Sequence, residues 1–171
     1  KNLFWQDGYE GDDIVASAAV NLPEGDAGII VSSDHDLYQL ISDVVSVFHP
    51  TGNVLVDKAA FELRYGVRPD QWVRVKAIAG CNGDKVNGIE GVGEITACKY
   101  LTGKLKEGSV YRQRVEGGYD TIEFNLPLVK LPFEGANRFV PVEDKVMMTD
   151  WNRVLRKLGM KSLRKFLDGV S

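Results

Sequence analysis

The first 57 residues alternate between helix-like and strand-like hydrophobic patterns. An alanine-rich run at 14–20 predicts a helix with acidic residues at or before its first turn. The continuous apolar run at 27–33 is typical of a buried parallel strand. A short helix at 37–41 and strands at 44–48 and 53–56 are expected next. This order of elements predicts an α/β sheet.

After residue 57 the pattern becomes helical. Helices are expected at 58–65, 70–79 and 94–100, and a loop with five glycines lies at 80–93. The remaining expectations are partial helix at 103–118, a short helix at 122–131 interrupted at Pro127, and basic amphipathic helices at 151–158 and 162–167.

The composition is that of a soluble globular protein. The chain has 171 residues, of which 44% are apolar and 26% charged, enough for one domain or a domain with a small appendage. No apolar run approaches the roughly 18 residues that a membrane helix needs, so no membrane contact is expected. Two cysteines and two histidines are too few for a disulfide framework, a cysteine-based zinc site or a histidine-rich metal site.

Charge divides the chain into an acidic front and a basic back. Residues 1–50 hold one cation and nine anions, a net charge of −8, whereas residues 51–171 have a net charge of +5. Uneven surface charge is one interpretation of this division. The other is a metal-binding half joined to a half that contacts phosphates.

Five acidic residues in the front half stand where a metal could collect them. Asp34 and Asp36 follow a predicted strand, and the carboxyl ends of strands are where open α/β sheets place their sites. Glu10, Asp12 and Asp13 precede or open the first helix. Clustered carboxylates repel one another unless a cation neutralises them, and Mg²⁺ prefers such oxygen ligands. Helix capping and a solvated turn are the structural alternatives.

The glycine-rich segment 88–93 precedes a helix, where backbone N–H groups can approach a phosphate. It follows a helix rather than a strand, which argues against dinucleotide binding and suits a helix–hairpin–helix on a DNA backbone. A tight connection between two helices is the plain alternative. Lys85, Lys99, Lys104 and Lys106 are nearby cations that could contact phosphates, although lone lysines are usually just solvated.

Four ordered segments carry a family resemblance over residues 9–101. Residues 9–14 resemble a Tyr-Glu-Ala-Asp-Asp-Ile/Val motif, and residues 33–40 resemble an Asp-x-Asp-x-x-Gln-Leu motif. Residues 65–84 and 88–97 are similar to a helix–three-turn–helix. These are motifs of the 5′ nucleases, a family of bacterial and bacteriophage 5′–3′ exonucleases and flap endonucleases that includes the nuclease domain of bacterial DNA polymerase I.

The resemblance implies metal-dependent hydrolysis with two Mg²⁺ or Mn²⁺ ions. The acids that match the catalytic cluster are Glu10, Asp12, Asp13, Asp34, Asp36 and Asp84, all of them metal ligands except Asp13, a further acid of the cluster. Cys81 stands where the family's Gly-Asp-x-x-Asp motif has its first Asp. A thiol is a poor ligand for Mg²⁺, so the second metal position is expected to be weaker or to rely on water and Asp84.

The glycine loop resembles the family element that holds a monovalent cation, usually K⁺, against a DNA phosphate. The residues expected to bind nucleic acid are Lys85, Gly88, Gly91, Gly93, Thr96 and Lys99. The implied fold is a PIN-like parallel sheet portion at 1–57, followed by a helical exonuclease C-terminal region at 58–171 with the helix–hairpin–helix at 70–101.

The family begins with a strand that bears a metal-binding Asp, and the residues before Glu10 are too few to supply it. Either the chain is a fragment or the N-terminal half is a separate polypeptide partner, and the chain alone is expected to be catalytically impaired. The implied substrate is DNA with a 5′ end, flap or nick, or RNA primers, in replication or repair in the cytoplasm of a bacterial or phage-infected cell. The alternatives are a non-catalytic duplex-binding fragment and a PIN-type ribonuclease; phosphatase chemistry at Asp34 and Asp36 fits poorly.

Overall fold

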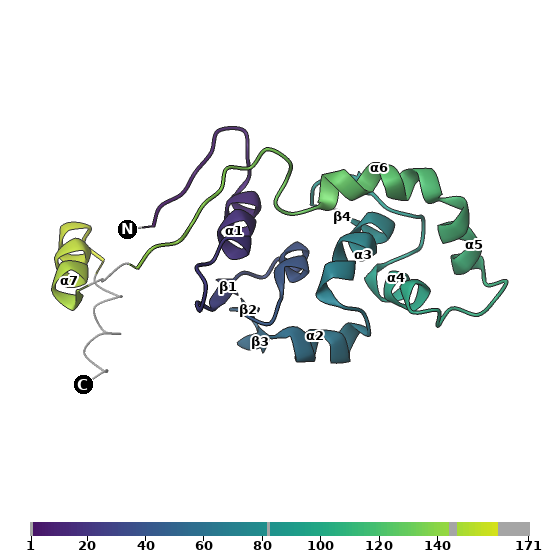
Figure 1. Cartoon of the computed structure of the whole chain (residues 1–171), viewed down its shortest axis with the longest axis horizontal. Coiled ribbons are helices and arrows are strands. Elements are labelled where there is room, and N and C mark those ends of the chain that lie inside the picture. Colours follow the sequence, from purple (N-terminus) through teal and green to yellow (C-terminus); the bar gives the residue numbers. More distant parts are fainter. Residues whose placement is uncertain (1, 82, 144–146, 161–171) are drawn as a thin grey trace. The chain divides into compact units, whose positions relative to one another are not determined.

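A small sheet with helices beside it carries the acidic front of the chain (Figure 1). The computed structural model describes residues 2–81, 83–143 and 147–160. Two compact units are present: one is Phe4–Pro141, and the other joins residues 1–3 to 142–171 and contains α7 (Met148–Lys157). The expected division at residue 57 concerns parts of the first unit and stays a prediction.

The sheet has the strand order β1-β2-β3. β1 (Gly28–Val31) pairs in parallel with β2 (Val45–His49), and β3 (Val54–Val56) pairs antiparallel to β2. The predicted strands are confirmed, but the expected parallel sheet is wrong for β3. Only residues 50–53 join β2 to β3, and such a short connection permits a hairpin but no parallel crossover.

β1 is an edge strand that is covered on one face. Ile30 points inward and is 8% exposed, whereas Ile29 and Val31 are 64% and 66% exposed. The expectation of a strand buried on both faces is therefore wrong within the described residues. The continuous apolar run leaves a hydrophobic strip facing outward.

The helices follow the sequence expectations, whereas two short strands lie in the segment 80–93 that was expected to be a loop. In the front half the helices are α1 (Gly11–Val20) and the 3₁₀ helix η1 (His35–Leu40). The later elements are α2 (Lys58–Tyr65), η2 (Pro69–Gln71), α3 (Trp72–Ala79), β4 (Gly80–Cys81), β5 (Val86–Asn87), α4 (Glu94–Leu101), α5 (Val110–Gly117) and α6 (Tyr119–Val129). The expected interruption at Pro127 is wrong, because α6 continues through it to Val129. Proline there removes a single backbone donor close to the helix end.

An aromatic cluster joins the sheet half to the helical half. Trp72 is fully buried, and its ring packs against Tyr38, Phe61 and Tyr65 at centroid distances of 5.7, 5.3 and 4.7 Å. Its indole N–H donates to the backbone carbonyl of His35 at 2.7 Å. Because His35 lies between Asp34 and Asp36, this contact fixes the segment that presents both acids.

α7 belongs to the second unit and confirms the helix expected at 151–158. The helix expected at 162–167 lies outside the described residues. Among the helices that the structure describes, none is long and apolar enough to cross a lipid bilayer.

Candidate metal centre

Four of the predicted acids line one hollow between α1 and β1. Glu10 precedes α1 and Asp12 lies in its first turn, Asp34 follows β1, and Asp84 lies between β4 and β5. The hollow has a volume of about 790 Å³, and its remaining walls are largely apolar. Residues more than seventy positions apart in the sequence therefore line the same hollow.

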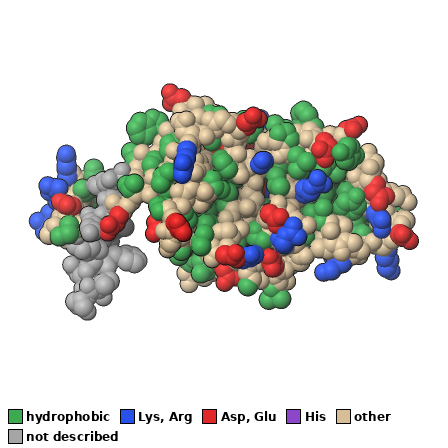
Figure 2. Space-filling model, viewed as in Figure 1, with side chains coloured by type: hydrophobic (Ala, Val, Ile, Leu, Met, Phe, Trp, Pro, Cys, Tyr) green, Lys and Arg blue, Asp and Glu red, His purple; other side chains and the backbone are tan. Residues whose placement is uncertain are grey.

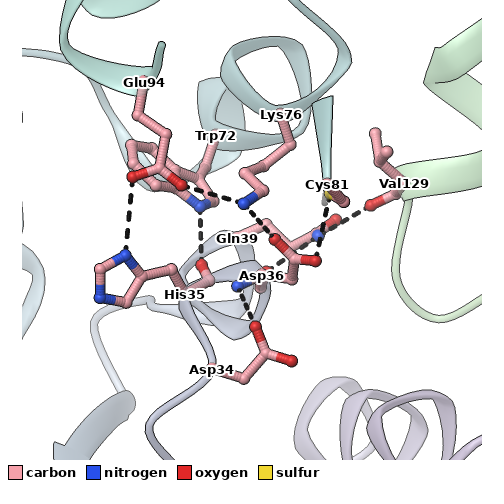
Figure 3. Close-up of polar contacts among 9 residues, drawn as sticks. All are labelled: Asp34, His35, Asp36, Gln39, Trp72, Lys76, Cys81, Glu94 and Val129. Atoms are coloured by element: carbon pink, nitrogen blue, oxygen red, sulfur yellow. Dashed lines mark hydrogen bonds and ion pairs between the residues drawn. The ribbon is translucent and has the colours of Figure 1, made fainter. Parts of the chain in front are cut away.

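Asp34 is held in place by its own helix start. Its carboxylate accepts a hydrogen bond from the backbone N–H of Asp36 at 2.8 Å, which caps η1 (Figure 3). Its own N–H donates to Ser32 Oγ at 3.1 Å. The side chain remains exposed. One carboxylate oxygen thus fixes the turn, and the exposed group remains available to a ligand.

The surroundings of Asp12 disfavour its negative charge. Burial is the largest cause of a raised pKa for this carboxyl, and the charges of Asp13 and Glu10 raise it further, while hydrogen bonds to backbone N–H groups oppose the shift. The ionised form is therefore disfavoured in the folded protein. A cation among these carboxylates would reverse that balance.

Replacing Asp12 by asparagine is expected to stabilise the metal-free protein at neutral pH. The raised pKa means that the folded state favours protonated Asp12; this contribution is present below the unfolded pKa and is lost as pH rises through the folded one. The variant should also lose stabilisation by Mn²⁺, which is about 2.7 kcal/mol for the wild type at 100 times its Kd. Thermal unfolding with and without Mn²⁺ checks both; equal stabilisation of both proteins by Mn²⁺ would contradict the assignment.

Asp13 makes the contacts of a structural residue. It is 7% exposed, and its two carboxylate oxygens accept hydrogen bonds from the backbone N–H groups of Phe133 at 2.7 Å and Glu10 at 3.3 Å. These bonds tie the segment after α6 to the start of α1. A catalytic role for Asp13 stays a prediction.

Asp36 turns away from Asp34 toward α3 and β4. Its Oδ1 lies 2.7 Å from the ammonium of Lys76, and its Oδ2 accepts a hydrogen bond from the Cys81 thiol at 3.3 Å (Figure 3). Ligand atoms of Asp36, Cys81 and Asp84 all lie within 4.8 Å of one another. Asp84 thus stands between the acids of the hollow and Asp36.

The two sets of donors differ in their fit to a hard divalent cation. Glu10, Asp12, Asp34 and Asp84 offer carboxylate oxygens at one hollow, as Mg²⁺ and Mn²⁺ prefer. The second set offers Asp36, which already has a cationic partner, and a buried thiol. Burial is the main cause that raises the pKa of Cys81 to about 12, and the charge of Asp36 adds to it. The first set offers only the oxygen donors that the implied ion prefers. The second set, which shares Asp84 and has its ligand atoms within 4.8 Å of one another, contains a thiol, a poor ligand for such an ion.

The glycine loop is shaped partly by packing. A Cβ on Gly88 would overlap the backbone of Ala79, and one on Gly80 would overlap that of Gly88. Gly91 has a φ of +73°, and the Arg114 guanidinium beside it donates to the carbonyl of Glu90 at 2.8 Å. Among Gly80, Gly88, Gly91 and Gly93, only Gly93 has open space around the position of a Cβ and an extended backbone. Gly93 and Thr96 line a shallow hollow at the start of α4.

The charges expected to contact DNA are dispersed. Lys85 lines a hollow beside Asp84, and Lys99 is an exposed residue of α4. Figure 2 shows acidic and basic side chains interspersed over α4 and α5 on the visible face, without a continuous basic patch there. Their roles stay predictions.

Sequence reasoning missed three polar residues that organise this centre. Lys76 and Glu94 form an ion pair at 2.9 Å, and Gln39 donates to the carbonyl of Val129 and accepts from the N–H of Leu131. Lys76 could have been noticed, because it stands among apolar residues on a helix whose neighbours are buried. Gln39 and Glu94 carried no comparable signal beyond the motifs that contain them, at 33–40 and 88–97.

The chain is similar to known proteins in both sequence and structure. Residues 2–66 match the family model described as 5′-3′ exonuclease, N-terminal resolvase-like domain. The chain is 32% identical to a 5′-3′ exonuclease of Aquifex aeolicus over 177 residues, which cover 95% of this chain and 60% of that protein. It is 44% identical over 95 residues to the thermostable DNA polymerase I of Thermus thermophilus, which cover 55% of this chain and 11% of that protein. These matches support membership of the chain in the 5′ nuclease family.

A solved structure supports the same relationship. The bacteriophage T5 D15 flap endonuclease, in a pseudo-enzyme-product complex with DNA and metal ions, superposes with a TM-score of 0.64 and 26% identity. The match covers 75% of this chain and 52% of that one. The chain therefore spans between about a tenth and three fifths of these relatives' own lengths.

Proposed function

We propose that the chain forms the metal-binding and duplex-binding part of a structure-specific 5′ nuclease that hydrolyses phosphodiesters of DNA in replication or repair. The convergence of Glu10, Asp12, Asp34 and Asp84 on one hollow carries this proposal. The exonuclease and flap-endonuclease names of the relatives support it. Because DNA is the substrate, the bacterial cytoplasm is the expected compartment.

The chain's own carboxylates would bind and orient the metal ion. A bound divalent ion would lower the pKa of an attacking water and stabilise charge on the phosphate, and Mg²⁺ or Mn²⁺ suits the four carboxylates. Asp34 is fixed by its hydrogen bond to Asp36 N–H, and Asp12 is poised by its crowded environment to favour a cation. No carboxylate is needed as a covalent nucleophile.

The α3–loop–α4 segment is proposed to grip the duplex as a helix–hairpin–helix, with K⁺ beside its glycine loop. The first N–H groups of any helix lack partners within it, and Gly93 has no side chain to cap those of α4. The acid in the first turn, Glu94, is neutralised by Lys76. The start of α4 can therefore receive a phosphate oxygen.

Replacing Gly93 by valine is expected to weaken duplex DNA binding by about tenfold or more, because hydrogen bonds to a charged group contribute about 1.5–3 kcal/mol. The extended backbone and open space at Gly93 accommodate a side chain, so the fold should persist. Gly52→Val, in the β2–β3 turn, is the matched control. Fluorescence anisotropy at fixed salt measures both variants; an unchanged affinity for Gly93→Val would leave the loop a purely structural turn.

The exposed edge of β1 is proposed to receive a further strand of the nuclease. β1 is a sheet edge with exposed Ile29 and Val31, and the hollow beside it is lined by apolar residues of α1 as well as the acids. A strand added there would bury this apolar strip and bring its own end to the acidic rim. A further carboxylate from that strand would complete the cluster.

Cleavage of a 5′-flap duplex tests the function. Activity is measured with Mg²⁺ and with chelator, with and without a polypeptide that supplies this further strand, on DNA and on matched RNA. The proposal expects metal-dependent cleavage of the DNA flap that the added strand increases. Binding without cleavage under every condition would favour a non-catalytic duplex-binding protein, and preference for RNA would favour a PIN-type ribonuclease.

A further inference from the structure

A buried ammonium stands beside the acid cluster. Lys76 is 7% exposed, and its Nζ lies 2.7 Å from Asp36 Oδ1 and 2.9 Å from Glu94 Oε1 (Figure 3). Burial by itself would lower the pKa of Lys76, but its bonds to the two carboxylates outweigh burial and raise it above the usual range. The side chain is therefore a fixed positive charge next to Asp36.

Cys81 occupies the other side of the same carboxylate. Its thiol is 5% exposed and donates to Asp36 Oδ2 at 3.3 Å. With Lys76 at Oδ1, both oxygens of Asp36 have a partner from the chain itself, although the Lys76 contact is an ion pair without aligned hydrogen-bond geometry. The side chain of Asp36 is only 14% exposed, so solvent contributes little.

We propose that Lys76 and Cys81 hold Asp36 in place of a second metal ion, so that the chain binds a single divalent cation at Glu10, Asp12, Asp34 and Asp84. This inference rests on the proposed metal centre and concerns how many ions it holds. We call Asp36, Lys76 and Cys81 together the Asp36 latch.

Electrostatics favour the latch over a second ion. If Asp36 turned to bind a cation, Lys76 would lose one of its two partners while remaining buried, and a buried unpaired charge is strongly unfavourable. The ammonium would also stand next to a divalent charge of the same sign. A thiol at Cys81 adds no negative charge to offset either cost, whereas a carboxylate there would.

The latch also connects the metal centre to the glycine loop. Glu94 opens α4, and its second oxygen lies 3.5 Å from His35 Nδ1. Lys76 therefore links the segment that presents Asp34 to the helix start proposed to bind phosphate. It acts as a positioning residue, because it neutralises Glu94 and orients Asp36 without contact to a reacting atom.

Counting bound Mn²⁺ tests the latch. Isothermal titration calorimetry is performed on the full chain, after chelator treatment, for the wild type, Cys81→Asp, Cys81→Ser and Lys76→Met. One Mn²⁺ per chain is expected for the wild type and for Cys81→Ser, the matched control that keeps a neutral donor. Two are expected for Cys81→Asp, where a new carboxylate pairs with Lys76, and for Lys76→Met, where the competing ammonium is gone. Circular dichroism verifies that each variant is folded.

Different failures have different meanings. Two Mn²⁺ bound to the wild type, or only one bound to both folded Cys81→Asp and Lys76→Met, overturns the latch and leaves the proposed nuclease centre standing. No Mn²⁺ bound to the wild type overturns the metal centre and the latch together. A thiolate charge-transfer band on adding Cd²⁺ to the wild type, absent in Cys81→Ser, shows that Cys81 is a metal ligand and likewise overturns the latch.

Discussion

Asp34→Asn is expected to reduce flap cleavage by at least about 10²- to 10³-fold while duplex affinity stays unchanged. The substitution removes a charged oxygen ligand, and a catalytic ion supplies several kcal/mol of transition-state stabilisation, at about 1.4 kcal/mol for each factor of ten. The asparagine carbonyl can still accept the hydrogen bond from Asp36 N–H, so the start of η1 should be kept. Single-turnover cleavage and anisotropy, under conditions in which the wild type cleaves, separate the two effects.

Asp26→Asn provides the matched control, since Asp26 is an exposed residue before β1 that lies outside the hollow. Its cleavage rate should equal that of the wild type. Calorimetry adds a readout that does not depend on activity, because Asp34→Asn should also weaken Mn²⁺ binding. Undiminished turnover together with undiminished Mn²⁺ affinity would remove Asp34 from the metal centre.

Trp72→Ala is expected to destabilise the protein by about 3–5 kcal/mol, the usual cost of truncating a fully buried large aromatic side chain. The cavity would open among Tyr38, Phe61 and Tyr65, and the carbonyl of His35 would lose its indole partner. Since natural domains are stable by only about 5–15 kcal/mol, this is a large share of the total. Urea unfolding monitored by circular dichroism measures the change.

Trp5→Ala is the control that separates the effect of losing a buried tryptophan on stability from that of losing an exposed one. Trp5 is 72% exposed, and surface substitutions usually change stability by less than about 0.5 kcal/mol. A loss of under 1 kcal/mol for Trp72→Ala would show that the aromatic cluster is not the joint between the two halves. If Trp72→Ala remains folded in the absence of urea, its Mn²⁺ affinity should fall as well, because His35 is displaced between Asp34 and Asp36.

Local patterns predicted most of the elements. The apolar runs marked β1, β2 and β3, and helix-forming segments bounded by glycine or proline marked α1 to α4, because these signals depend on near neighbours in the chain. The interruption predicted at Pro127 was wrong, because the packing of α6 outweighs the loss of one backbone hydrogen bond. The direction of β3 was open to inference from its short connection, which only a hairpin satisfies.

Some residues of the candidate site could likewise be predicted from the sequence, and others could not. Its acids could be selected from the sequence because they stand together in recognisable motifs at strand and helix ends. The side chains that contact these acids could not be predicted from the sequence. The contact of Lys76 with Asp36 spans forty positions and that of Cys81 spans forty-five, and nothing local to either residue specifies them.

By itself, then, the sequence determined an α/β front, a helical back and a set of carboxylates suited to a hard cation. Only the tertiary structure decided that Glu10, Asp12, Asp34 and Asp84 share a hollow while Asp36 is held by Lys76 and Cys81. The physical reason is that residue type fixes which ligand a side chain prefers. Which side chain or ion a carboxylate contacts depends on long-range packing. Here α3 packs against η1, and Trp72 of α3 donates a hydrogen bond to His35.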